Sequence, residues 1–178
     1  MSIYQKVAKI GTKFIGRDKL FKHGFNLSPM YRRSTGRIVH VSDDLHMVRV
    51  RIPISFRNRN YVNSIFGGSL FSATDPIHMV QLINILGDDY VVWDKSAEIT
   101  FRIPAKSDVY ADFTYTAAEI LEIQQRIAEE NEIEIKKSID LQDKDGNRTF
   151  ARVQKVLYVA NKAYYLEKRK RRNGKTSE

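Results

Sequence analysis

The most apolar stretch of the chain runs from Leu70 to Leu86. On a helix of about 3.6 residues per turn, its apolar side chains point in every direction rather than along one stripe. A helix with that pattern has to be covered by protein on all sides. The stretch therefore predicts one long central helix, preceded by Gly67 and Gly68 and ended by Gly87.

Alternation of apolar and polar residues predicts strands on both sides of this helix. The strands expected before it are 36–42 and 47–54, and those expected after it are 90–94 leading into 97–103, 109–115, 132–141 and 148–160. Strands that follow one another are expected to pair as three hairpins. A surface helix is expected over 117–131.

These elements restrict the fold class. Each strand has one buried face, and the central helix needs cover all round, so the sheet has to curve around the helix. The sequence therefore predicts an α+β domain in which an antiparallel sheet of five to six strands wraps one long central helix.

The two ends of the chain are basic and differ from the middle. Residues 1–26 place apolar residues at helical spacing with lysines between them, which predicts an amphipathic helical extension. Residues 161–178 contain five consecutive basic residues and no apolar periodicity, which predicts a flexible tail. The folded domain is therefore expected over 27–160.

Composition narrows the classes of chemistry. A chain of 178 residues with 42% hydrophobic content is expected to fold as one domain. The absence of cysteine excludes disulfides, thiolate metal sites and a cysteine nucleophile, and suits a reducing cytoplasm. The four histidines show no paired spacing, so no metal site is predicted. No phosphate loop, dinucleotide fingerprint or serine-hydrolase elbow is present, and no apolar run resembles a signal peptide or a membrane span.

The formal charge of +9 predicts an anionic partner. That partner could be nucleic acid, an acidic membrane face or a phosphorylated ligand such as a nucleotide-bearing cofactor. Most of the excess positive charge lies near the two ends of the chain. Binding of nucleic acid or membrane through these ends is the least favoured of the functions considered.

The candidate catalytic groups are one acid and the uncapped N-terminus of the central helix. Gly67 and Gly68 leave backbone N–H groups free at a positive helix end, where an oxyanion could bind. Asp75 follows about two turns later, where it could activate water. The same residue followed by Pro76 is also a good helix start, so Asp75 could instead act only as an N-terminal cap. Pro76 also predicts a kink over 72–76.

The spacing of these residues resembles that of the hotdog-fold acyl-CoA thioesterases, especially the phenylacetate-pathway type and a bacterial branch described as tetrameric acyl-CoA thioesterases. In the phenylacetate type an Asn precedes a His-Gly-Gly by six residues, and an Asp follows the second glycine by seven. This chain has Asn60, then Phe66-Gly67-Gly68, then Asp75, and later a strand ending in Ile103-Pro104-Ala105. The resemblance covers about residues 27–160.

The resemblance implies roles for these residues. The N–H of Gly67 would polarise the thioester carbonyl, Asp75 would act as general base or nucleophile, and Asn60 would orient water or the carbonyl. Gly68 and Phe66 would line the substrate site, but Phe66 stands where the family has His, which makes the mouth more apolar. Asp94 stands near the place of a water-positioning Ser or Thr, which would bring a second carboxylate to the site and alter which acid is the base.

The resemblance also implies partners. The substrate would be an acyl-CoA, with coenzyme A entering as part of the substrate and no separate cofactor. Sites in this family lie between subunits, so a homodimer or homotetramer is expected, with the nucleotide end of the substrate on a basic rim. The alternative function is a non-catalytic hotdog module that binds acyl-CoA or a lipid.

Overall fold

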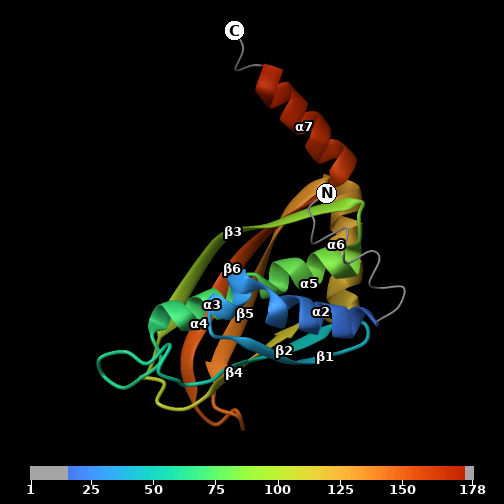
Figure 1. Ribbon diagram of the computed structural model, residues 1–178. Helices are drawn as coiled ribbons and strands as arrows, with labels where there is room; N and C mark the ends of the chain where they lie inside the picture. The colour runs from blue at the N-terminus through green and yellow to red at the C-terminus, as the bar shows by residue number, and fades with distance from the viewer. Residues whose placement is uncertain (1–15, 175–178) are drawn as a thin grey trace.

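The computed structural model describes residues 16–174, which form a curved antiparallel sheet around a pair of helices (Figure 1). The strands are β1 (Arg37–Val41), β2 (Met47–Ile52), β3 (Tyr90–Phe101), β4 (Val109–Thr114), β5 (Glu132–Gln142) and β6 (Thr149–Asn161). The helices are α2 (Arg17–Leu27), α3 (Pro29–Arg33), α4 (Gly67–Thr74), α5 (Ile77–Leu86), α6 (Ala117–Glu130) and α7 (Lys162–Gly174). The order of strands in the sheet is β1-β2-β4-β5-β6-β3. The predicted α+β class with a curved sheet around a central helix is confirmed.

The pairing of β3 differs from the expected hairpins. The hairpin predicted between 97–103 and 109–115 is wrong, because β3 pairs with β6 while β4 pairs with β2 and β5. Residues 90–94 also belong to the same strand as 97–101. The strand that leaves α5 lies at the far edge of the sheet, so that the helix is enclosed, and residues 102–108 then carry the chain across to β4. The other two predicted hairpins, β1–β2 and β5–β6, are confirmed.

The central helix is interrupted at Asp75-Pro76, where the proline predicted a kink. Asp75 is the C-terminal cap of α4, and Pro76 is the N-terminal cap of α5. Proline lacks the N–H that would continue the helix, and its ring clashes with the carbonyl four residues earlier. No side chain caps α5. The alternative in which the Asp75 carboxylate serves as an N-terminal cap is therefore not what the structure shows.

Two apolar clusters surround this helix pair. The first packs α4 and the start of α5, through Leu70, Ala73 and Ile77, against the inner faces of β1, β2, β4, β5 and β6. The second packs Leu82 and Leu86 of α5 against α6 and the other end of the sheet. The surrounding protein does not bury the helix pair on every side, because the residues of α5 that face away from the sheet are only half-buried. The expectation of a fully enclosed helix thus holds for the sheet side alone.

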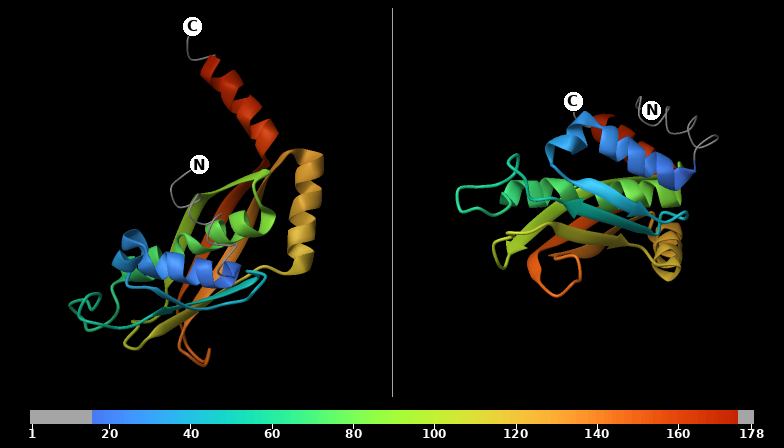
Figure 2. Two further views of the ribbon diagram at one scale, coloured as in Figure 1. Left: turned by 45° about the vertical axis from the view of Figure 1, so that its right-hand side comes forward. Right: turned by 60° about the horizontal axis from the view of Figure 1, so that its bottom comes forward.

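The basic tail forms helix α7 in the described residues, although its composition predicted a flexible segment. The helix extends away from the sheet (Figures 1 and 2). At its base, Tyr165 packs edge-on against Trp93 of β3, with ring centroids 5.2 Å apart. Lys168 pairs with Glu132 at 2.5 Å, and Glu167 pairs with Arg171 one turn later. These local pairs stabilise a helix that apolar periodicity alone did not predict.

The predicted N-terminal extension lies partly outside the described residues, which begin at residue 16. Within them, α2 is tied to β1 because the side chain of Asn26 both donates to and accepts from the main chain of Ile38, at 2.8 and 2.9 Å. No helix in residues 16–174 is both long and apolar enough to cross a membrane. The division of the chain at residues 27 and 160 stays a prediction.

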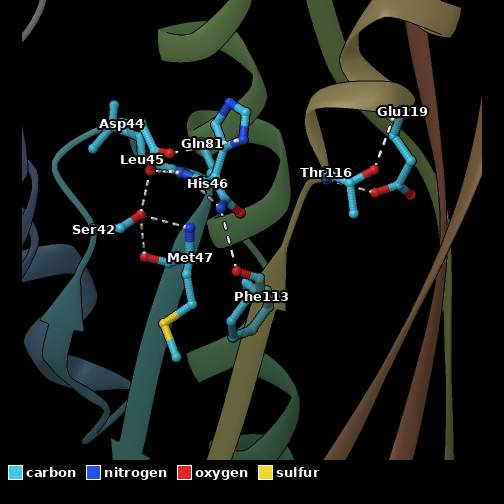
Figure 3. Close-up of polar contacts among 9 residues, drawn as sticks. All are labelled: Ser42, Asp44, Leu45, His46, Met47, Gln81, Phe113, Thr116 and Glu119. Atoms are coloured by element: carbon cyan, nitrogen blue, oxygen red, sulfur yellow. Dashed lines mark hydrogen bonds and ion pairs between the residues drawn. The ribbon is translucent and has the colours of Figure 1, made fainter.

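Gln81 connects α5 to the sheet (Figure 3). Its side chain is fully buried, and its Nε2 donates to the carbonyl oxygens of Leu45 at 2.7 Å and Phe113 at 3.2 Å. Those carbonyls belong to the turn before β2 and to β4, so one amide links the helix to two strands. On the neighbouring helix α6, Thr116 and Glu119 form a capping box that begins the helix.

We expect Gln81→Leu to lower the free energy of unfolding by about 1–3 kcal/mol, because two buried carbonyl oxygens lose their donor. Urea denaturation followed by circular dichroism measures the change. Gln125→Leu on the surface helix α6 is the matched control. A Gln81 variant as stable as the wild type would show that these carbonyls need no donor.

Candidate functional site

The loop that leads into α4, residues 53–66, is held at its base by Asn58. Asn58 is 3% exposed, and its amide donates to Thr35 Oγ1 at 2.8 Å and to the carbonyl of Pro53 at 2.9 Å. The carbonyl of Asn58 accepts from the N–H of Phe66 at 2.7 Å. These bonds fix the residue directly before the central helix.

Asn60, the predicted orienting residue, is occupied by its own turn. Its Oδ1 accepts from the main-chain N–H groups of Val62 and Ser64 at 3.1 and 3.0 Å, and its Nδ2 donates to Ser64 Oγ at 2.9 Å. Asx turns of this kind are a common structural use of asparagine. In the described chain, the side-chain amide of Asn60 is therefore engaged within its own loop.

Two aromatic rings lie over the start of α4. A β-carbon on Gly67 would lie 2.7 Å from Cζ of Phe101, and one on Gly68 would collide with the ring of Phe66. Only glycine allows this close approach. No side chain caps α4, and the N–H groups of Ser69 and Leu70 donate to the carbonyl of Phe66. Within the described residues this leaves the N–H groups of Gly67 and Gly68 for a ligand at the positive end of the helix.

Asp75 and Asp94, the two predicted acids, meet at one buried lysine. The side chain of Lys155 on β6 is 0% exposed. Its ammonium group donates to Asp94 Oδ2 at 2.7 Å, to the carbonyl oxygen of Asp75, and to Asp75 Oδ1 at 3.4 Å. An ammonium group has three N–H donors, and here each finds an acceptor.

The two carboxylates differ in exposure. The Asp75 side chain is 54% exposed, whereas that of Asp94 is 20% exposed and its Oδ1 is buried without a hydrogen-bond partner in the described structure. Burial raises the pKa of Asp94 above its ordinary value; the hydrogen bond and charge of Lys155 oppose this shift, and the charge of Asp75 adds to it. Of the two acids, Asp75 is thus the one open to a ligand.

A β-bulge places Asp94 at this site. The register between β3 and β6 shifts between Asp94, opposite Leu157, and Ser96, opposite Val156, so Lys95 is an extra residue. Bulges bend a strand and turn the neighbouring side chain. Asp94 therefore reaches Lys155 because the strand is irregular at that position.

The structure brings some of the predicted residues together and separates others. Asp75 and Asp94 share Lys155, while Gly67 and Gly68 lie at the other end of α4. Eight residues separate Gly67 from Asp75, which is a rise of about 12 Å in a helix. Within one copy of the chain, the helix end and the acid are thus two separate parts of a candidate site.

Lys155 is a residue of the candidate site that the sequence pattern did not predict, although the pattern contains a signal for it. Along β6, Val153, Leu157 and Val159 are buried, and Lys155 falls on the same face by a period of two. A lysine at a core position is rare unless it has an ionic partner. A lysine at a buried position of the apolar–polar alternation of β6 therefore indicates a buried acidic partner.

His78 is a second buried polar group close to this site. Its side chain packs edge-on against Phe113 and Tyr115, with ring centroids 4.9 and 5.4 Å apart, and neither ring nitrogen has a partner in the described structure. Burial, followed by the charges of Lys137 and Lys155, lowers the pKa of His78 to about 3. His78 is therefore a neutral core residue at physiological pH.

Comparison with known proteins places the chain in a family. Residues 17–159 match the model of the family described as "Domain of unknown function (DUF4442)". No curated protein matches the sequence significantly.

Solved structures share the fold. A Pseudomonas aeruginosa protein described as a probable thioesterase is 22% identical, with a TM-score of 0.71 over 80% of this chain and 95% of that one. A Haemophilus influenzae thioesterase is 12% identical, with a TM-score of 0.58 over 80% and 90%. A Staphylococcus aureus thioesterase, solved as a mutant, is 11% identical, with a TM-score of 0.53 over 75% and 99%. At these identities the likeness shows the fold, and the predicted hotdog fold is confirmed.

We expect the buried His78 to make the fold sensitive to acid. In the unfolded chain this residue binds a proton below pH 6.5, the ordinary pKa of a histidine, whereas the folded chain binds it only below about 3. Between these values the unfolded state binds more protons, so the free energy of unfolding falls as the pH is lowered, by up to about 1.4 kcal/mol per pH unit for one group.

His78→Phe, which keeps the ring, should reduce this pH dependence. Urea denaturation at pH 4.5, 5.5 and 7.5 measures it, and His40→Ala, at an exposed position on β1, controls for the loss of an imidazole. Equal slopes for His78→Phe and the wild type would contradict the prediction.

Proposed function

The chain belongs to the DUF4442 family, and we propose that it is a hydrolase of acyl thioesters, with acyl-CoA as its substrate class. The observation that carries the proposal is the meeting of Asp75 and Asp94 at Lys155, in a fold whose central helix begins with uncapped N–H groups at Gly67. The description of the fold neighbours as thioesterases supports the same reaction class.

In the proposed reaction, Asp75 is the general base. Its exposed carboxylate accepts a proton from water, whose oxygen attacks the thioester carbonyl carbon. The N–H of Gly67 donates to the oxyanion that forms at the positive end of α4. The carbon–sulfur bond then breaks, and Asp75 passes the proton to the leaving thiolate, so that the products are a carboxylic acid and the thiol of coenzyme A and the base is restored. Asp94 is not the base here, because its free oxygen is buried.

We propose that the complete site forms between two copies of the chain. The separation of Gly67 and Asp75 along α4, about 12 Å, is too long for both to act at one carbonyl within one copy. Two copies with their α4 helices antiparallel would place the Gly67 end of one beside the Asp75 of the other. Strand β3 supports such pairing, because it lies at one edge of the sheet and its middle residues are exposed. The assembly would be a homodimer, or a tetramer of two such dimers.

The segments around the start of α4 suit a ligand that is both anionic and apolar. Residues 29–33, 55–66 and 101–107 contain no acidic residue, and they lie together because Asn58 bonds to Thr35 and the N–H of Ile65 bonds to the carbonyl of Ala105. Their basic residues are Arg32, Arg33, Arg57, Arg59, Arg102 and Lys106. Their exposed apolar side chains are Met30, Phe56, Tyr61, Val62, Phe66, Phe101 and Ile103. An acyl-CoA carries phosphates and an acyl chain, so it matches both features.

We expect Asp75→Asn to lower kcat/KM for acyl-CoA hydrolysis by about 10³-fold, because the amide cannot accept the proton from water. Release of free thiol from short, long and aromatic acyl-CoAs measures the rate, and Asp145→Asn in the β5–β6 turn is the matched control. A variant as active as the wild type would remove Asp75 from the mechanism. A wild-type protein that binds these acyl-CoAs without cleaving any of them would favour the alternative of a non-catalytic binding module.

We expect the double substitution Arg57→Ala and Arg59→Ala to raise KM for acyl-CoA about tenfold, the equivalent of about 1.4 kcal/mol. Both side chains are exposed, so the fold should tolerate the change. KM for the matching acyl-pantetheine, which lacks the nucleotide, should stay the same. Arg126→Ala on α6 is the control, and equal losses with both substrates would show that these arginines do not recognise the nucleotide.

A further inference from the structure

Lys155 occupies a position where an apolar residue would be expected. The inner face of β6 runs Val153, Lys155, Leu157, and the lysine side chain between the two apolar residues is fully buried. Val153 belongs to the cluster around α4, and Leu157 belongs to the cluster around the end of α5. The lysine therefore stands where the two halves of the core meet.

Burying this ammonium group is unfavourable unless it is compensated. Moving an ion from water into a protein interior costs several kcal/mol, and an apolar pair of similar volume is often as stable or more so. The ion pair with Asp94 at 2.7 Å and the bonds to Asp75 offset that cost. The fold alone gives no reason for a lysine here.

Two backbone irregularities lie at the same point. The central helix breaks at Asp75-Pro76, and the main-chain oxygen of Asp75 at this break accepts a hydrogen bond from Lys155. The bulge at Lys95 turns Asp94 toward the same ammonium group. A buried ion, an interrupted helix and a bulged strand each weaken a regular fold, and such departures concentrate at functional sites.

We propose that Lys155 is a positioning residue of the thioester site. Its ammonium group holds the main chain of Asp75 at the end of α4, and Asp94 serves as its counter-charge, so that the Asp75 carboxylate is fixed in orientation and left open to water. The inference rests on the proposed function and adds to it a residue that contacts neither the substrate nor the water. Lys155 acts through Asp75.

The first test replaces the charge and keeps the bulk. We expect Lys155→Met combined with Asp94→Asn to fold, because the buried ion pair is removed together. Its melting temperature should lie somewhat below that of the wild type, because the main-chain oxygen of Asp75 loses its donor. Its kcat should fall about 10²-fold while KM changes less than about twofold, because a base displaced by about 1 Å slows the chemical step. Lys137→Met, the lysine opposite Lys155 on β5, is the matched control. A folded double variant with wild-type kcat would overturn the proposal.

The second test restores the ammonium group chemically. The chain has no cysteine, so Lys155→Cys introduces a single thiol. Alkylating it in denaturant with 2-bromoethylamine and refolding gives a side chain of nearly the length and charge of lysine, and iodoacetamide gives a neutral one of similar size. We expect the aminoethylated protein to recover at least about a tenth of the wild-type kcat and the neutral adduct to stay about 10²-fold below it. Equal kcat values for the two folded adducts would overturn the proposal.

These outcomes are distinct from failure of the proposed function. A wild-type protein that cleaves no thioester would overturn the hydrolase and the positioning role together. An active wild type whose kcat does not depend on the Lys155 charge would overturn the positioning role alone.

Discussion

The rest of this structure depends on one constraint, which is that a mostly apolar helix pair has to be buried by a sheet with only one apolar face. The sheet meets it by curving, and its longest strands, β3 and β6, pair along nearly their whole length to cover one side of α4 and α5. This leaves β3 at an edge. Burial of the helix and an unpaired edge strand are therefore two results of the same geometry.

The polar site interrupts the core that this geometry creates. Lys155 separates the apolar cluster around α4 from that around the end of α5, at the level where Pro76 separates the helices themselves. A continuous helix over a continuous apolar face would lack the free carbonyl that Lys155 binds. The break and the buried cation therefore depend on each other, and one without the other would leave an unsatisfied polar group inside the protein.

His78 lies one turn further on and remains neutral because burial and nearby positive charges disfavour its protonation, which lowers its pKa.

Periodicity predicted those parts of the fold that depend on which face of an element is buried. It located the strands, α6 and the central helix within a few residues, and Pro76 predicted the break in that helix. It could not predict which strands pair, because a period of two is the same for any partner, and β3 was therefore assigned to β4 rather than β6. It also could not predict helix α7, whose order comes from the Tyr165–Trp93 contact and charge pairs rather than from an apolar face.

The sequence indicated the two acids of the candidate site, but it did not indicate that both of them bond to one lysine. The spacing after the glycines pointed to Asp75, and the resemblance to the hotdog thioesterases pointed to Asp94, yet nothing local shows that both reach one ion. That relation needs Lys155 on β6, which lies 80 residues beyond Asp75 in sequence. Rules that search for apolar positions along a strand also pass over a single lysine, even though its place in the alternation marks it as buried.

In the proposed reaction the two ends of α4 have different tasks, because the glycine end binds the substrate and its developing oxyanion while Asp75 at the other end activates water. At the glycine end, the aromatic rings of Phe66 and Phe101 and the surrounding arginines lie on exposed segments, where side chains can adjust to a large ligand. At the other end, Asp75 is bonded to a lysine whose three donors all have acceptors and whose side chain is fully buried. The proposed hydrolysis would need this difference, since recognition of a long flexible substrate tolerates movement and proton transfer from water does not. An acid held by a buried ion, with its carboxylate still exposed, meets the stricter of the two requirements.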